Sequence, residues 1–353
     1  MQGSKTKYDD WKDLIRRSVR RPEALRDEIQ AGSPDLDRVA ERYPMRINAY
    51  FLNVLRSAGP ALAKQVVPDA AELTDQTGFE DPLGEEEDSP VPNLTHRYPD
   101  RVLFLVTTEC AVYCRFCTRK RKAGKAGIVT DETIEAGLSY IEQHPDVKDV
   151  LISGGDPFML PDDALSRILS RIKSVPHVEI IRIGTRIPGV MPQRVTPELA
   201  DLLGQANPLF LNLHFNHPDE ITDEVRGACA LLADAGLSLG SQTVLLRGIN
   251  DDPDTLERLF RSLLRMRIRP YYLLQADPAR GTSHFRTRIE TGVEIMRQLR
   301  GRISGLAVPA YVVDLPGGGG KVPLLPEYVV RRQPDVWEIR NYEGKKHSYH
   351  QVH

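Results

Sequence analysis

Short apolar segments alternate with amphipathic ones from residue 101 to residue 314, and this alternation limits the fold more than any other feature. The apolar, β-branched segments predict buried strands at 101–107, 148–153, 178–184, 208–214, 237–246, 269–275 and 308–314. The segments with helical periodicity predict helices at 131–143, 162–174, 197–205, 221–235, 254–266 and 290–300. Strands that alternate with helices at this spacing form βαβ units and a parallel sheet. We therefore predict an α/β fold, a partial (β/α)6 TIM-like barrel.

The chain before this alternation has a different character. Apolar residues at helical spacing predict helices within residues 1–75. The acidic, proline-containing stretch from Asp81 to Pro92 predicts a solvated linker without a function of its own. The predicted division of the chain is a helical region with the linker, a barrel and a C-terminal segment, at 1–95, 96–305 and 306–353.

Composition argues against several classes of protein. The formal net charge of −2 leaves no strong basic field for nucleic acid or acidic lipid. No apolar run approaches the roughly 20 residues of a membrane span. The first residues, Met1 to Lys5, lack the apolar core of a signal peptide. We expect a cytoplasmic protein that binds neither nucleic acid nor membrane.

Three of the four cysteines follow the first predicted strand. Cys110, Cys114 and Cys117 have the spacing C-x3-C-x2-C. Sulfur ligands suit zinc or an iron–sulfur cluster. A structural zinc site needs four ligands, so a histidine would have to complete it. Three cysteines can instead hold a four-iron cluster that leaves one iron open to a small molecule.

The other predicted strands also end in polar or ionisable residues. The carboxyl ends of parallel strands gather reactive groups at one face of a barrel, so we expect one catalytic face. After the cysteines, the strand-end residues in chain order are Gly154-Gly155-Asp156, Thr185-Arg186, His214, Gln242, Arg247, Asp277 and Asp314.

A glycine-rich segment follows the last strand. It contains four glycines between Asp314 and Lys321, and four glycines can form a backbone nest for an anion such as phosphate. The segment is not a P-loop, because Lys321 is followed by Val322. A lysine beside a phosphate site suggests a Schiff base to pyridoxal 5′-phosphate (PLP).

Together, five motifs resemble those of the lysine 2,3-aminomutase family. They are Cys110-x3-Cys114-Arg115-x-Cys117-Thr118-Arg119-Lys120-Arg121, Gly154-Gly155-Asp156, Leu213-His214-Phe215-Asn216-His217-Pro218, His284-Phe285-Arg286-Thr287 and the glycine quartet. The resemblance extends from about Tyr43 to Tyr342. It implies a barrel of the radical S-adenosylmethionine (SAM) type, with a 4Fe–4S cluster, SAM and PLP as cofactors. The implied enzyme is an isomerase that interconverts L-lysine and β-lysine by moving the α-amino group to the β-carbon.

The resemblance also implies roles for individual residues. The cluster ligands would be Cys110, Cys114 and Cys117, and the residues near SAM would be Gly154, Gly155, Asp156, His214 and Gln242. Lys321 would be the catalytic lysine that carries PLP, with Arg97 and Arg101 on the PLP phosphate. The substrate carboxylate would bind Arg119, and its distal ammonium would bind Asp277 and Asp314. Two carboxylates favour a cationic substrate over glutamate, since like charges repel.

Several alternatives stay open on the sequence alone. Within the family these are an arginine 2,3-aminomutase and a lysine aminomutase that serves elongation factor P. Outside it they are a radical SAM enzyme without PLP and a zinc-stapled binding protein. The resemblance further implies a reductant such as flavodoxin or ferredoxin, and a homo-oligomer. The sequence also departs from the family at three points. It lacks the C-terminal zinc-binding cysteines of longer family members, and Phe116 stands where the lysine enzymes have a histidine. We interpret the end of the chain, with His347, His350 and His353, as a terminal tail.

Overall fold

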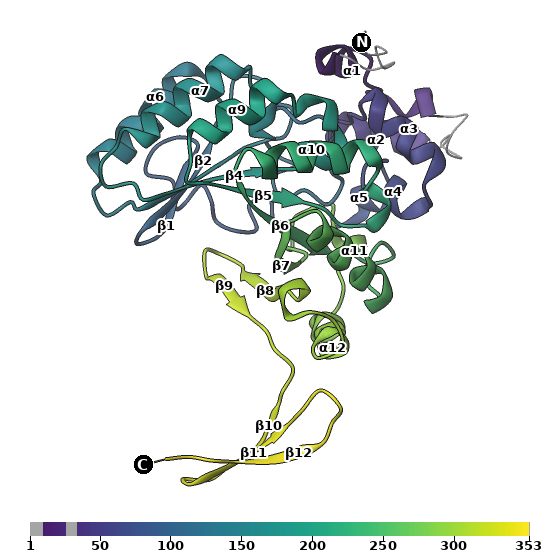
Figure 1. The fold of residues 1–353 in the computed structure, drawn as a ribbon. Coiled ribbons are helices and arrows are strands. Elements are labelled where there is room, and N and C mark those ends of the chain that lie inside the picture. Colours follow the sequence, from purple (N-terminus) through teal and green to yellow (C-terminus); the bar gives the residue numbers. More distant parts are fainter. Residues whose placement is uncertain (1–9, 26–33, 353) are drawn as a thin grey trace, which may run out of the picture.

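The barrel is one sheet of nine strands that follow one another in chain order, β1 to β9 (Figure 1). The computed structural model describes residues 10–25 and 34–352. The strands are β1 (Leu94–Tyr98), β2 (Arg101–Leu105), β3 (Asp149–Ser153), β4 (Ile180–Thr185), β5 (Leu209–His214), β6 (Ser238–Leu245), β7 (Arg269–Gln275), β8 (Ala310–Leu315) and β9 (Gly320–Pro323). Strands β2 to β8 are parallel, whereas β1 and β9 pair antiparallel at the two edges. Because β1 and β9 do not pair with each other, the barrel is open.

Six long helices connect the parallel strands. They are α6 (Asp131–Gln143), α7 (Asp162–Lys173), α9 (Pro197–Gln205), α10 (Asp223–Asp234), α11 (Pro253–Arg265) and α12 (Ile289–Leu299), and the one-turn helix α8 (Ile187–Val190) precedes α9. Thr196 and Asp252 cap α9 and α11, where a proline occupies the first turn. The predicted strands, helices and partial barrel are thus confirmed, with bounds shifted by one or two residues. Short 3-10 helices lie at Pro22–Leu25, Pro157–Met159, Pro192–Arg194, Pro218–Glu220, Ser283–Phe285 and Gly305–Ala307.

The region before the barrel is helical, as predicted, in the part that the structure describes. Its helices are α1 (Trp11–Arg16), α2 (Pro34–Arg42), α3 (Ala49–Ser57), α4 (Pro60–Lys64) and α5 (Ala71–Thr74). The prediction for residues 1–9 and 26–33 lies outside the described residues. Isolated β-bridges join Val19 to Ile47 and Ile47 to Val112, so this region is attached to the loop that carries the cysteines.

The prediction of a solvated linker at Asp81–Pro92 is wrong. Glu85 is only 5% exposed, and its carboxylate forms an ion pair with Arg119. Pro82 is also buried. A run of charges does not by itself establish solvent exposure, because a partner elsewhere in the chain can cover part of it, and this segment faces the basic residues that follow the cysteines.

The C-terminal segment forms a second, three-stranded antiparallel sheet that projects from the barrel (Figure 1). Its strands are β10 (Val329–Arg332), β11 (Val336–Arg340) and β12 (Lys346–His350). His347 and His350 lie in β12, so the interpretation of these two residues as a tail is wrong, whereas His353 lies outside the described residues. Every residue of β12 is exposed, and a strand without a buried face gives no apolar alternation to detect. Within 10–25 and 34–352, no helix has the length and apolar character to cross a bilayer.

Candidate active site

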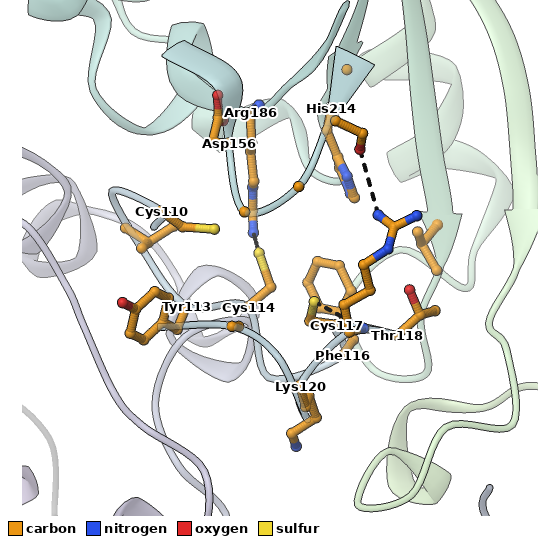
Figure 2. A pocket seen from close by; sticks show the side chains of 18 of the residues that line it. Cys110, Tyr113, Cys114, Phe116, Cys117, Thr118, Lys120, Asp156, Arg186 and His214 are labelled. Atoms are coloured by element: carbon orange, nitrogen blue, oxygen red, sulfur yellow. Dashed lines mark hydrogen bonds between the residues drawn. The ribbon is translucent and has the colours of Figure 1, made fainter. Parts of the chain in front are cut away.

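One cavity opens at the carboxyl ends of the barrel strands (Figure 2). It is lined by predicted site residues from the loop after β2 and from the ends of β3, β5, β6 and β7. These are Cys110, Cys114, Cys117, Arg119, Gly154, Gly155, Asp156, His214, Gln242 and Asp277. Their ligand-binding roles stay predictions, but the expected common face is present. Lys321, Asp314, Arg97 and Arg101 are not among the described residues that line this cavity.

The sulfurs of Cys114 and Cys117 receive hydrogen bonds that suit thiolate ligands. Arg186 Nη1 lies 2.7 Å from Cys114 Sγ, and the backbone N–H of Arg119 lies 3.3 Å from Cys117 Sγ. Burial, together with the neighbouring Cys114, raises the pKa of Cys117 to about 11. The free thiol therefore keeps its proton at neutral pH, and iron would have to displace that proton on binding. Donors aimed at the sulfurs are a means of stabilising a bound iron–sulfur cluster.

The three cysteine side chains are not gathered around a single point in this structure. Among residues 10–25 and 34–352, no group of three Cys, His, Asp or Glu side chains is close enough to hold a single metal ion. In a four-iron cluster each cysteine binds a different iron atom, so its ligands need not converge on one point. Three cysteines on one loop are thus compatible with the ligand set of a four-iron cluster.

A buried ionic cluster anchors the cysteine loop to the N-terminal helices. Glu72, at the first turn of α5, is fully buried. It accepts hydrogen bonds from Arg115 Nε and Nη2, at 2.9 and 2.6 Å, and from Lys120 Nζ at 2.6 Å. Burial alone would raise the pKa of Glu72, but the two cations outweigh it and lower that pKa. The chain on both sides of Cys117 is thereby fixed.

The glycine pair after β3 packs against the cysteine loop. A side chain on Gly155 would place its Cβ 2.3 Å from the carbonyl oxygen of Glu109, and Gly154 has φ of +139°. The N–H groups of Gly155 and Asp156 donate to the carbonyls of Thr107 and Glu109, at 2.6 and 2.8 Å. The implied position of these glycines near SAM stays a prediction. Their observed role is structural, because the N–H groups of Gly155 and Asp156 join the two loops to each other.

The carboxylate of Asp156 is engaged by the protein itself. It accepts from Thr185 Oγ1 at 2.7 Å and from three backbone N–H groups, those of Phe158, Arg186 and Ile187, at 2.7 to 3.1 Å. Burial raises the pKa of Asp156 to about 6 despite these donors. Asp156 thus ties the end of β3 to the end of β4, and the predicted contact with SAM would add to this role.

The sequence analysis named Arg186 only as a residue at the end of a strand, and the structure places it in the site. Its side chain reaches from the end of β4 to Cys114 (Figure 2). Its Nη2 donates to Gln65 Oε1 at 2.6 Å. Glu220 lies 3.4 Å away. Burial would lower the pKa of Arg186, but Cys114 and Glu220 outweigh it and raise that pKa. A buried cation thus lies directly beside the cysteines.

His214 is a neutral imidazole in this cavity. Burial, reinforced by Arg186, lowers its pKa to about 3. Its Nε2 lies 3.0 Å from Asn216 Oδ1, and because an amide oxygen only accepts, Nε2 carries the proton. The ring centroid lies 5.6 Å from that of Phe116. His214 can therefore accept at Nδ1 but does not supply a positive charge.

Arg119 is held by Glu85. Its Nε lies 2.9 and 3.0 Å from the two carboxylate oxygens, and its Nη1 lies 3.5 Å from Ser153 Oγ. Burial would lower the pKa of Arg119, but Glu85 outweighs it and raises that pKa. The sequence analysis assigned Arg119 to the substrate carboxylate and did not predict that another residue of the chain binds it.

Lys321 and Asp314 face each other across the β8–β9 hairpin. They are direct partners in the antiparallel register, and Lys321 Nζ forms an ion pair with Asp314 Oδ2. The side chain of Lys321 is 34% exposed, whereas that of Asp314 is 5% exposed. Burial, followed by the nearby Asp314 carboxylate, raises the pKa of Asp277 to about 7, and Lys321 acts in the opposite direction. Asp277 thus lines the cavity that contains the cysteines and also interacts electrostatically with Asp314 and Lys321 of the β8–β9 hairpin.

The two predicted phosphate ligands have different surroundings. Arg97 is half-buried beside the glycine turn, where it binds Asp88 at 2.8 Å and lies 3.9 Å from Asp314 Oδ1. Arg101 begins β2, is 44% exposed and pairs with Asp100 at 2.9 Å. Its guanidinium lies 4.6 Å from the ring of Tyr98, whose hydroxyl accepts from the backbone N–H of Lys321. Arg97 is thus adjacent to the hairpin, and Arg101 reaches it only through Tyr98.

Comparison with known proteins places the chain in a class and then in a family. The family model of the radical SAM superfamily matches residues 104–260, and this match implies a 4Fe–4S cluster and SAM. A second family model, described as lysine-2,3-aminomutase, matches residues 296–352.

Individual relatives narrow the assignment. L-lysine 2,3-aminomutase of Acetoanaerobium sticklandii is 46% identical over 356 residues, which cover 98% of this chain and 85% of the relative. The enzyme of the same name from Clostridium subterminale is 46% identical over 349 residues, covering 97% and 84%. The chain belongs to the lysine 2,3-aminomutase family. Glutamate 2,3-aminomutase of Clostridioides difficile is 43% identical over 310 residues, covering 87% and 74%, so the substrate must be argued from the site.

Proposed function

We propose that this protein is a radical SAM, PLP-dependent isomerase that interconverts L-lysine and β-lysine. The observation that carries the proposal is the pair of carboxyl groups of the half-buried Asp277 and the buried Asp314, beside a cavity that also contains Arg119. An α-amino acid with a cationic side chain presents a carboxylate for the arginine and a distal cation for the aspartates. A glutamate substrate would bring a third carboxylate to this pair, which is unfavourable.

The hydrogen bonding of Asp314 supports a cationic ligand. Among the described residues, no donor makes a hydrogen bond to its buried Oδ1. The nearest cation paired with this oxygen is Arg97 Nη1, at 3.9 Å. A buried carboxylate oxygen without a hydrogen bond is costly, so a bound ammonium group would relieve that cost.

The residues around the hairpin are also of the kinds that PLP requires. Lys321 offers a primary amine, and its side chain is only partly covered. Gly317, Gly318 and Gly320 have positive φ angles, and Arg97 is the basic residue next to this turn. When bound, PLP would supply a conjugated system that can delocalise an unpaired electron while the amino group migrates. In this arrangement Arg119 would orient the substrate carboxylate, and the aspartates would hold its distal end in place.

We also propose cellular partners for the reaction. Radical SAM chemistry begins with a one-electron reduction, and a small protein such as flavodoxin or ferredoxin would supply the electron in the cytoplasm. We further propose a homo-oligomer, which light scattering on the purified protein would test.

One assay tests the function directly. The anaerobically reconstituted protein is incubated with dithionite, SAM, PLP and either L-lysine, L-arginine or L-glutamate, and the products are separated by chromatography and mass spectrometry. We expect β-lysine from L-lysine and no comparable product from the other two. Turnover of arginine or glutamate without turnover of lysine would reject the proposed substrate.

A further inference from the structure

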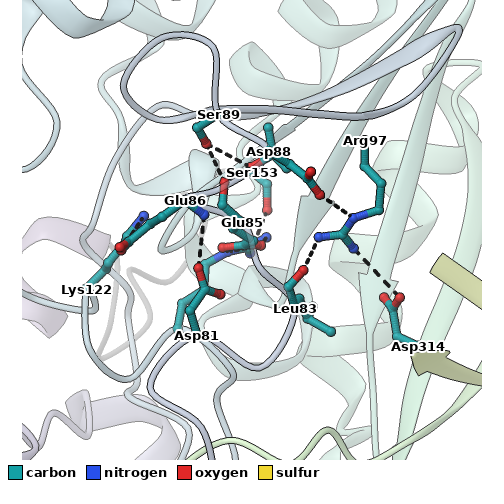
Figure 3. A network of polar contacts seen from close by, with 12 residues as sticks. Asp81, Leu83, Glu85, Glu86, Asp88, Ser89, Arg97, Lys122, Ser153 and Asp314 are labelled. Carbon is teal, nitrogen blue, oxygen red and sulfur yellow. Dashed lines mark hydrogen bonds and ion pairs between the residues drawn. The ribbon is translucent and has the colours of Figure 1, made fainter. Parts of the chain in front are cut away.

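The acidic segment that the sequence predicted to be a linker lies against the walls of the active site (Figure 3). We call residues 81–89 the acidic strap. Toward the cysteine loop, its residues form ion pairs with Arg119, Arg121 and Lys122. Toward the glycine hairpin, Asp88 binds Arg97, and the carbonyl of Pro82 accepts from the N–H of Gly317 at 3.3 Å. The strap thus contacts both parts of the proposed substrate site.

Within the strap, Glu85 makes the contact that matters for the substrate. Its side chain is 6% exposed, and both of its carboxylate oxygens bind Arg119. The bonds use Nε and Nη2, which form one edge of the guanidinium group. Burial would raise the pKa of Glu85, but Arg119 outweighs it and lowers that pKa. Glu85 is therefore an ionised partner of Arg119.

The geometry leaves the other edge of Arg119 available. A guanidinium group has five N–H donors in a planar fork and can bind two carboxylates at once. Arg119 Nη1 points instead at Ser153 Oγ, 3.5 Å away, and both Arg119 and Ser153 line the cavity. A substrate carboxylate on the Nη1–Nη2 edge would not have to displace Glu85.

The backbone around Glu85 is held by several hydrogen bonds. The carbonyl of Glu85 accepts from Ser89 Oγ at 2.5 Å and from Thr95 Oγ1 at 3.4 Å. Asp88 N–H donates to the carbonyl of Gly84 at 3.1 Å, and Glu86 N–H donates to Asp81 Oδ2 at 2.9 Å. These hydrogen bonds indicate that the backbone around Glu85 stays in place when the substrate binds.

We propose that Glu85 is a positioning residue, which holds one edge of Arg119 so that the opposite edge can bind the α-carboxylate of the substrate. This inference rests on the proposed function, because it takes the substrate to be an amino acid. An arginine side chain has many rotamers, and fixing it in advance removes an ordering cost from substrate binding. Loss of that ordering would raise KM by about tenfold.

The test compares KM and kcat of the reconstituted holoenzyme with its variants. Glu85→Gln should raise KM for L-lysine by about tenfold and change kcat by less than about threefold, because it affects binding more than chemistry. Glu86→Gln is the matched control: Glu86 is the next residue of the strap, is 63% exposed and pairs with Arg121 and Lys122. We expect no change in that variant.

A double-variant cycle shows whether Glu85 acts through the arginine. Arg119→Lys should raise KM by itself, and adding Glu85→Gln to it should produce little further change. Independent effects of the two substitutions would overturn the proposal. So would an unchanged KM in Glu85→Gln, and so would a lowered KM, which would mean that Glu85 competes with the substrate for Arg119.

A second measurement needs no turnover. Phenylglyoxal modifies exposed guanidinium groups, and peptide mapping reports the rate at each arginine. Arg119 should react several times faster in Glu85→Gln than in the unsubstituted protein or in Glu86→Gln, and equal rates would contradict the assigned contact. If lysine is not turned over, the proposed function fails. The same kinetic comparison is then made with whichever amino acid is turned over, since every α-amino acid has the carboxylate.

Discussion

Replacement of Asp314 by Asn tests the proposed ammonium site most directly. Asp314 is buried, pairs with Lys321 and raises the pKa of Asp277. Asn keeps the shape of the side chain but removes its charge. The variant therefore separates electrostatic attraction for the substrate from packing.

The expected size of the effect follows from Coulomb's law. A carboxylate and an ammonium group about 4 Å apart attract each other by about 4 kcal/mol at an effective dielectric constant of about 20. Asp277 remains in the variant, and Asp314 also serves Lys321, so we assign about half of this energy, or about 2 kcal/mol, to Asp314. That loss corresponds to an increase in KM for lysine of about 30-fold.

The assay is steady-state turnover of L-lysine at saturating SAM and PLP. Asp234→Asn is the matched control, because Asp234 forms an ion pair with Arg267 on the surface and its side chain is 67% exposed. Such a pair contributes little, so KM should not change. An Asp314→Asn enzyme whose KM stays within about threefold of the original would refute the electrostatic argument. PLP content is measured in parallel to exclude loss of the cofactor as the cause.

Three further predictions concern other parts of the site. The pKa of Asp277 is raised to about 7, so this carboxyl group is mostly protonated at pH 6 and ionised at pH 8. A cationic substrate prefers the ionised form, so KM for lysine should fall as the pH rises through 7, and Asp277→Asn should remove this dependence. Replacing the buried Glu72 by Gln should lower the free energy of unfolding by about 3–5 kcal/mol, measured by denaturant titration, because the charges of Arg115 and Lys120 lose their partner; an unchanged midpoint would contradict this. Gly155→Ala should prevent retention of the cluster, measured as bound iron and sulfide, since its Cβ would lie 2.3 Å from a carbonyl oxygen of the cysteine loop; full iron content would show that the loops can separate.

The sequence predicts the barrel well because the physical signals are local. Strands buried on both faces appear as apolar runs, and the caps at Thr196 and Asp252 mark where helices begin. The predicted residues around the cysteines lie at strand ends, which converge in any parallel barrel. Their position at one cavity therefore follows from topology.

Partnerships across long stretches of sequence were not predictable in this way. Glu85 and Arg119 are far apart in the chain, and a run of acidic residues looks the same whether it is solvated or paired. Arg186 follows a strand like many surface arginines do, and only the structure shows it beside Cys114. The resemblance implies that Gly154 and Gly155 lie near SAM, and only the structure shows that these glycines also allow two loops to touch. A basic segment of matching length after the cysteines was the one signal that could have suggested a partner for the acidic strap.

The pairing of Asp314 with Lys321 across the β8–β9 hairpin has a consequence for how this enzyme could change. Side chains on successive strand residues point to opposite sides, so inserting or deleting one residue in the glycine turn would rotate the amine to the outer surface. The length of the glycine turn is therefore as restricted as the identity of the lysine. A change in that length would abolish activity even though every reactive residue was still present.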